Sequence, residues 1–135
     1  MPADGRFVGS LGNAAARWVF MFAINFYSEA YADMLKKGRK TATIRLGDRS
    51  DKYRSGQLVW ITVGRKYGQR QRLFTAIIDS VVVKSASELT PREVEKESPE
   101  LRRTEDVLNL LSRIYDRAVT PEDPVTIVHF SRVME

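Results

Sequence analysis

Residues 38–48 read GRKTATIRLGD and bring a lysine, a threonine and an arginine into one short stretch. A threonine hydroxyl is a poor nucleophile until a base removes its proton, so Thr43 needs a partner. Lys40 is a candidate base if burial or a nearby cation lowers its pKa from about 10.4. Arg39 and Arg45 are candidate cations, and Arg45 is also suited to holding a carbonyl oxygen or a phosphate.

The spacing of Lys40 and Thr43 sets a geometric condition. In one continuous strand these two positions point to opposite faces. We therefore expect Lys40 to lie in a bend after Gly38, before the regular strand begins, because glycine readily adopts a left-handed helix end. The alternative is that Thr43 is an ordinary strand residue and that Arg45 forms a salt bridge that ties down the following loop.

The composition excludes several kinds of site. The chain has no cysteine, which excludes disulfides, zinc–cysteine sites and thiol catalysis. His129 is the only histidine, so the chain offers few residues for a histidine-rich metal site or a Ser-His-Asp triad. His129 alternates with apolar neighbours, and we expect it to be structural. No phosphate loop or dinucleotide motif is present, and the sequence predicts neither a metal nor a cofactor.

Positive charge is concentrated in the first part of the chain. Residues 1–80 hold 14 Lys and Arg against 6 Asp and Glu, whereas residues 81–135 hold 8 against 11. This asymmetry favours a face that attracts anions such as nucleic acid, although a basic surface also serves solubility. Two predicted loops mix cations with tyrosines, as surfaces that bind single-stranded nucleic acid do; the alternative is a pair of solvated loops. The loop residues are Lys52, Tyr53, Arg54, Arg65, Lys66, Tyr67, Arg70 and Arg72.

Apolar periodicity and capping signals predict five strands and about three helices. The expected strands cover residues 18–26, 41–46, 57–63, 72–83 and 124–133. A first helix is expected over residues 28–38 with Ser28 as its N-cap. Thr90 and Glu93 predict a capping box at the start of a second helix. A third helix follows, with an apolar stripe of Val107, Leu110, Leu111 and Ile114. Trp60 is expected in the core.

The predicted element order favours one small domain. The order β-α-β-β-β-α-α-β lacks the alternating rhythm of a doubly wound fold and indicates an α+β protein with a small curved sheet or barrel. Residues 1–17 are expected to form a flexible tail, and residues 18–135 the domain. The longest apolar run is too short to span a bilayer, and no signal-peptide cleavage site is evident. We expect a soluble, cytoplasmic monomer that has no membrane partner.

The stretch from Gly38 onward resembles the motif region of ASCH domains, which share the PUA-like barrel. The usual family motif is GxKxxExR, and this chain matches it at Gly38, Lys40 and Arg45 while Thr43 replaces the glutamate. The threonine form resembles a narrower group, the small bacterial N4-acetylcytidine amidohydrolases, whose motif reads GRKTxTIR. The resemblance covers about residues 22–132 and is weaker around the helices, where this chain has extra residues.

The resemblance implies a PUA-like mixed barrel of about five strands flanked by about three helices. It also implies a catalytic set of lysine, threonine and glutamate, which falls on Lys40, Thr43 and Glu97. Ligand-binding residues are then expected in the motif and in both basic loops; they are Gly38, Arg39, Arg45, Tyr53, Arg54, Arg65, Lys66 and Tyr67. The implied ligand is a nucleoside or single-stranded RNA.

Three functions follow from this reading. The first is hydrolysis of an N4-acylated cytidine, in which Glu97 passes a proton to the leaving amine. The second is RNA binding by the same basic cleft without catalysis. The third is cleavage of RNA, as in an ASCH-type ribonuclease.

Overall fold

A computed structural model describes residues 22–65 and 68–134. The expectations for residues 1–17, for the first part of the strand over 18–26, and for Lys66 and Tyr67 lie outside this range. The strands are β1 (Phe22–Phe26), β2 (Ala42–Leu46), β3 (Leu58–Gly64), β4 (Arg70–Ser85) and β5 (Pro124–Arg132). The helices are α2 (Ala30–Lys36), the short 3₁₀ helix η1 (Ala86–Glu88), α3 (Pro91–Glu97) and α4 (Thr104–Tyr115).

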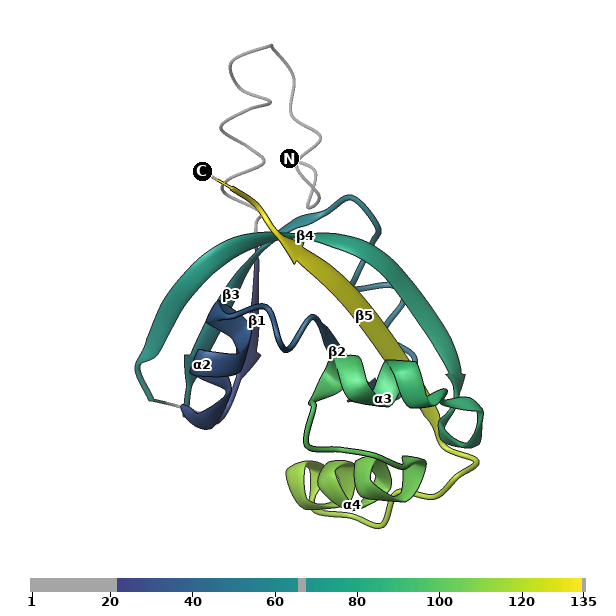
Figure 1. Cartoon of the computed structure of the whole chain (residues 1–135). Coiled ribbons are helices and arrows are strands. Elements are labelled where there is room, and N and C mark those ends of the chain that lie inside the picture. The colour runs from purple at the N-terminus through teal and green to yellow at the C-terminus, as the bar shows by residue number, and fades with distance from the viewer. Residues whose placement is uncertain (1–21, 66–67, 135) are drawn as a thin grey trace.

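One curled sheet organises the chain (Figure 1). Its five strands run in the order β1-β3-β4-β5-β2, with β1 parallel to β3 and the other pairs antiparallel. The long strand β4 pairs with β3 through its first half and with β5 through its second half, and the register shifts between Ile61 and Thr62 and again between Ile78 and Ser80. Such bulges bend a strand, so β4 forms an arch. The predicted small α+β, PUA-like architecture is confirmed as a half-barrel whose edges are β1 and β2.

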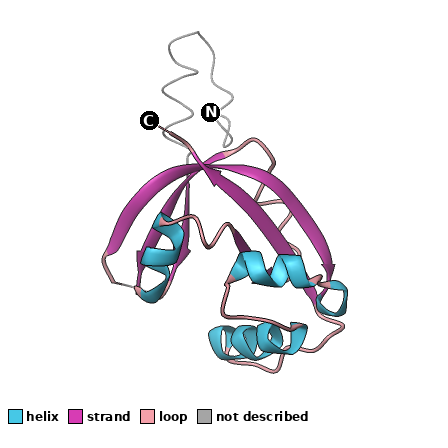
Figure 2. Cartoon of the chain, in the orientation of Figure 1, coloured by secondary structure: helices cyan, strands magenta, loops and turns pink. Residues whose placement is uncertain are grey.

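Two apolar clusters pack on this sheet. Figure 2 shows the strands of the sheet and the helices that accompany them. The first cluster fills the side of β1, β3 and β4 against Leu35 of α2, and it includes Phe26, Ile61 and Phe130. The second lies between β2, β5 and the helices that follow β4, with Val94 of α3 in its interior. Residues of β2 alternate between the two regions: Ala42, Ile44 and Leu46 belong to the second cluster, whereas Thr43 is in register with Val128 of the first.

Local signals account for the helix boundaries, with one correction. The capping box at α3 is confirmed, since Thr90 Oγ1 accepts from Glu93 N at 3.2 Å and a Glu93 carboxylate oxygen accepts from Thr90 N at 2.9 Å. Ser28 is not the N-cap of α2; Glu29 occupies that position, while the Ser28 hydroxyl accepts from Ala30 N at 3.2 Å.

The apolar stripe predicted for α4 is only half right. Val107 and Leu111 are buried, but Ile114 is 51% exposed. Leu108 and Tyr115 pack on the second cluster instead. The stripe is rotated because α4 contacts α3, η1 and β2 together, and the directions of these contacts decide which face is covered.

Candidate functional site

The segment between α2 and β2 places Lys40 ahead of the regular strand. Gly38 has a φ of 73°, in the left-handed region, and ends the helix. The Lys40 backbone N–H still donates to Met34 O at 3.2 Å, and Thr41 N donates to Lys96 O of α3 at 3.1 Å. Since β2 begins only at Ala42, the expected bend between helix and strand is present.

The Lys40 side chain is buried and saturated with acceptors. The residue is 1% exposed, and its amine donates to Ala42 O at 2.9 Å, to the backbone carbonyl of Glu97 and to Glu97 Oε1. Glu97 lies at the end of α3, 57 residues further along the chain, and is 5% exposed. A charged lysine has three N–H donors, and here each has a partner.

The same ion pair completes the open edge of β2. Glu97 Oε2 accepts from Ile44 N at 2.6 Å, and Ala42 O accepts from the Lys40 amine. These two backbone groups belong to the edge of β2 that has no neighbouring strand in the part of the chain that the structure describes. Two side chains therefore satisfy backbone groups that a further strand would otherwise pair.

Burial governs the electrostatics of this pair. It disfavours the charged ammonium and lowers the pKa of Lys40, while the Glu97 carboxylate opposes the change and the charge of Arg45 adds to it. The amine lies 4.9 Å from the Phe26 ring centroid and 5.2 Å from that of Tyr31. The pKa of Tyr31 is raised, first by burial and then by the negative charge of Glu97. The pKa of Lys40 is therefore below that of an ordinary lysine, although the Glu97 carboxylate stabilises the charged form.

Thr43 and Arg45 form a second pair on β2. Arg45 Nε donates to Thr43 Oγ1 at 3.0 Å, and Arg45 Nη2 donates to Asn25 O of β1 at 3.2 Å. The guanidinium carbon lies 5.5 Å from the Phe26 ring centroid, so the Phe26 ring contacts both cations of the site. Arg45 spans the gap between the two edge strands, and within the described residues it forms no salt bridge.

The two pairs are neighbours but are not joined directly. Among the hydrogen bonds of the described residues, none connects the Lys40 amine to the Thr43 hydroxyl. The structure thus brings Lys40 and Glu97 into contact, and it pairs Thr43, which is 3% exposed, with Arg45, whose guanidinium also lies near the Phe26 ring. Direct contact occurs within each pair, and the Phe26 ring links the pairs.

Sequence reasoning missed the groups that support Arg45. Asn25 is 6% exposed; its amide nitrogen donates to Gly64 O at 3.1 Å, and its amide oxygen accepts from Thr62 Oγ1 at 2.8 Å. This network fixes the backbone of β1 at the carbonyl that receives Arg45. A polar Asn25 inside the apolar run of residues 22–26 was the available signal.

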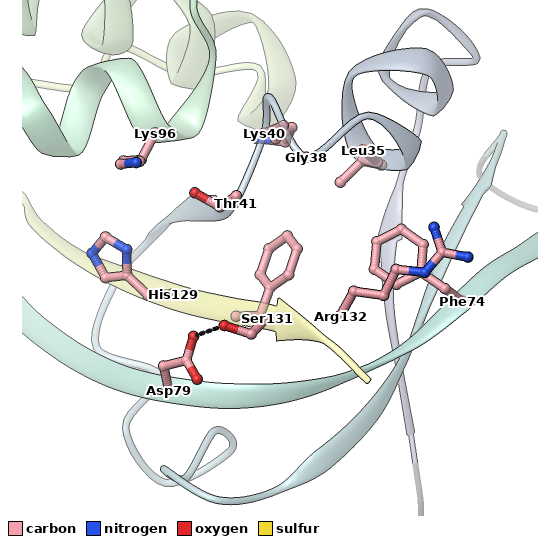
Figure 3. A pocket seen from close by; sticks show the side chains of 11 residues that line it. Leu35, Gly38, Lys40, Thr41, Phe74, Asp79, Lys96, His129, Ser131 and Arg132 are labelled. Carbon is pink, nitrogen blue, oxygen red and sulfur yellow. Dashed lines mark hydrogen bonds between the residues drawn. The ribbon is translucent and has the colours of Figure 1, made fainter. Parts of the chain in front are cut away.

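A pocket of about 450 Å³ opens beside the segment between α2 and β2 (Figure 3). Gly38, Lys40 and Thr41 line one wall, and residues of β4 and β5 line the other. Neither Thr43 nor Glu97 is among the lining residues. His129 also lines this pocket and is half-buried, so its side chain is accessible rather than part of the core.

The predicted loop residues divide into two groups. Tyr53 is 3% exposed and packs in the first cluster, with its ring 5.7 Å from that of Phe22, so it is a core residue and cannot stack on a base. Arg54 and Arg65 are exposed and remain accessible to a ligand, as is Arg39 of the motif. Arg70 and Arg72, predicted in a loop, belong instead to strand β4.

Trp60 departs from its expected place in the core. It is half-buried beneath the guanidinium of Arg72, which lies 5.1 Å from its ring, and its indole N–H is buried with no hydrogen-bond partner among the described residues.

Two further expectations concern absences. Within residues 22–65 and 68–134, no group of three or more His, Cys, Asp or Glu side chains is arranged to hold a metal ion. No helix in this part of the chain is long and apolar enough to cross a membrane.

Solved structures with the same fold are found despite low sequence identity. An ASCH domain from Lactobacillus crispatus JV V101 superimposes with a TM-score of 0.63 at 16% identity, over 88% of this chain and 84% of that one. The DUF984 protein EF3133 from Enterococcus faecalis V583 gives a TM-score of 0.60 at 15% identity, over 84% of this chain and 80% of that one. An ASCH protein mutant from Zymomonas mobilis gives 0.52 at 15% identity, over 80% and 66%. The sequence matches no protein-family model and no curated protein.

Proposed function

We propose, from the premise that this chain has the ASCH-domain fold, that it belongs to the ASCH family and hydrolyses the amide of an N4-acylated cytidine. Lys40, Thr43 and Glu97 are the proposed catalytic residues, and residues 18–135 are the proposed domain. The observation that carries the proposal is the buried Lys40–Glu97 pair beside a threonine whose oxygen already accepts from a guanidinium.

Each side chain has a defined part in the proposed reaction. Thr43 Oγ1 attacks the acyl carbon and loses its proton to the neutral Lys40 amine. Arg45 Nε already donates to this oxygen and stabilises its negative charge as the proton leaves. The carbon–nitrogen bond then breaks, and Glu97 relays the proton to the departing cytidine amine. Water cleaves the resulting Thr43 ester, which releases the carboxylic acid and restores the hydroxyl.

The saturated amine sets a requirement on this scheme. Lys40 donates to three acceptors in the structure, so it must release one of them before it can take a proton from Thr43. The lowered pKa favours that step, because it reduces the cost of the neutral amine. Substrate binding must therefore bring the Lys40 amine and the Thr43 hydroxyl into hydrogen-bond contact, which they do not make among the described residues.

Release of cytidine from N4-acetylcytidine tests the proposal directly. We expect the full chain to release cytidine and acetate, measured by chromatography. Thr43→Val keeps the shape of the side chain but removes the hydroxyl, and it is expected to lower kcat/KM by at least ~100-fold. Thr75→Val is the matched control, since Thr75 is a strand threonine of similar burial at 6% exposed, and it should retain activity. Absence of turnover in the parent chain would contradict the proposal.

A second candidate is RNA binding without catalysis. The observation that favours it is that every donor of Lys40 and both carboxylate oxygens of Glu97 already have protein partners, as in a purely structural ion pair. In this case the chain binds single-stranded RNA with an affinity that falls as salt increases, and Thr43→Val has no effect on it. RNA that is degraded in the parent but not in Lys40→Ala would instead indicate a ribonuclease.

A further inference from the structure

The pocket beside the segment between α2 and β2 has a polar end that the proposed hydrolysis does not use. Thr41, Lys96 and His129 surround this end, and they come from three different parts of the chain (Figure 3). The hydrogen bond from Thr41 N to Lys96 O holds α3 against the segment at 3.1 Å. His129 is in register with Ala42, the residue that follows Thr41. The backbone therefore brings an ammonium, an imidazole and a hydroxyl to one place.

The positive charge at this end is available to a ligand. Lys96 is exposed and forms no salt bridge within the described residues, whereas Lys40 in the same wall is engaged by Glu97. His129 and Thr41 are half-buried, and neither side chain has a hydrogen bond to another described residue. Free donors around one cavity, with an unpaired cation among them, suit an anionic group such as phosphate.

The carboxylate of Asp79 also lines this pocket. The register shift between Ile78 and Ser80 places Asp79 at a bulge of β4, where Ser131 Oγ of β5 donates to Asp79 Oδ2 at 2.5 Å. The other carboxylate oxygen has no hydrogen bond to the described residues. Asp79 thus keeps a free acceptor, held in a fixed orientation, and such an acceptor suits a hydroxyl group rather than an anion.

The remaining wall of the pocket is apolar and ends in a planar cation. Leu35, Phe74 and Phe130 line it, and the Arg132 guanidinium lies 5.0 Å from the Phe74 ring centroid. Nucleobases stack on aromatic rings and on guanidinium planes, and this wall offers both kinds of group. One cavity therefore offers donors for an anion, an acceptor for hydroxyls, and an apolar wall with a stacking plane.

We propose that this pocket binds a ribonucleoside monophosphate. The phosphate lies between Lys96 and His129, a ribose hydroxyl donates to Asp79, and the base lies along the apolar wall beside the Arg132 guanidinium. The volume of about 450 Å³ falls in the range of sites that enclose small ligands, about 300–1,000 Å³. This inference goes beyond the hydrolase proposal, because none of these contacts requires chemistry at Thr43.

Calorimetric titration of the full chain tests the site with three probes: cytidine 5′-monophosphate, cytidine and inorganic phosphate. We expect the nucleotide to bind at least about tenfold more tightly than cytidine at low ionic strength, since the phosphate adds charge-assisted hydrogen bonds. The advantage should shrink as salt increases. Equal affinity for nucleotide and nucleoside would overturn the proposal, as would binding of inorganic phosphate as tight as that of the nucleotide.

Substitutions locate the phosphate and the ribose. Lys96→Gln should abolish the preference for nucleotide over nucleoside, whereas Lys36→Gln, which removes an exposed lysine of α2 outside the pocket, should leave it unchanged. Asp79→Asn should abolish the preference for cytidine 5′-monophosphate over its 2′,3′-dideoxy form. A preference that survives Lys96→Gln would show that the phosphate binds elsewhere. These experiments measure binding alone, so their outcome does not depend on whether the chain hydrolyses N4-acetylcytidine.

Discussion

The buried site on β2 and the polar end of the pocket contain similar side chains, which are buried and paired in the first and more exposed and unpaired in the second. In the buried site, each N–H of the Lys40 amine and each oxygen of the Glu97 carboxylate has a hydrogen-bond partner in the protein. At the pocket, Lys96 is exposed and unpaired among the described residues, and His129 is half-open. A lysine thus supports the sheet edge at position 40 and is free for a ligand at position 96. The two lysines differ in burial and in hydrogen-bond partners.

This difference predicts where substitutions cost stability and where they cost binding. A buried charge whose partner is removed stays desolvated, so the fold loses much of its stability. An exposed charge is already hydrated, so its removal changes the fold little. The following variants test the contrast, starting with the largest expected effect on the free energy of unfolding.

Lys40→Met should destabilise the chain most. It leaves the Glu97 carboxylate buried and without its cation, and we expect a loss of about 3–5 kcal/mol in denaturant unfolding. The double variant Lys40→Met/Glu97→Leu should lose less than the sum of the two single variants. Lys37→Met is the control, since Lys37 pairs with Asp33 at the surface and should cost under about 1 kcal/mol. Equal losses at positions 37 and 40 would show that the buried pair is not structural.

Thr62→Val should have the next largest effect. It removes the hydroxyl that donates to Asn25 Oδ1 at 2.8 Å and leaves a buried acceptor without a partner, which costs about 1–3 kcal/mol. Thermal or denaturant unfolding measures the loss, with Thr75→Val as a control of similar burial. A Thr62→Val chain as stable as the Thr75→Val chain would mean that the network behind Arg45 contributes nothing to the fold.

Glu93→Gln should have a smaller, pH-dependent effect. Partial burial opposes ionisation of Glu93, but hydrogen bonds from Thr90 and the ammonium of Lys84 outweigh it, and the pKa lies below its ordinary value of 4.5. The stability that the ionised carboxylate adds is therefore complete above about pH 4.5 and is lost as the pH falls through the lower, folded-state value. Unfolding curves of parent and variant should converge in acid; a constant difference down to pH 2 would contradict this.

Lys96→Gln should change stability least, by less than about 0.5 kcal/mol, because the ammonium is exposed and unpaired within the described residues. Unfolding at neutral pH measures the change. A loss as large as that of Lys40→Met would show that Lys96 also supports the fold, and the contrast between the two regions would disappear.

Short-range signals in the sequence determined much of the fold. The capping box at Thr90 and Glu93, the helix end at Gly38 and the alternation along β2 each depend on residues a few positions apart. Backbone conformation responds to such neighbours directly, through sterics and local hydrogen bonds. The element order then sufficed to predict a small curved α+β sheet.

Only the tertiary structure decided which residues meet. Lys40 contacts Glu97 across 57 residues, and Arg45 reaches Asn25 because the sheet curls until β1 and β2 face each other. The burial of Tyr53 and the exposure of Ile114 likewise depend on how whole elements pack. Sequence periodicity reports that an element has an apolar face, but the direction of that face and the partners of each charge are set by the summed contacts of distant segments.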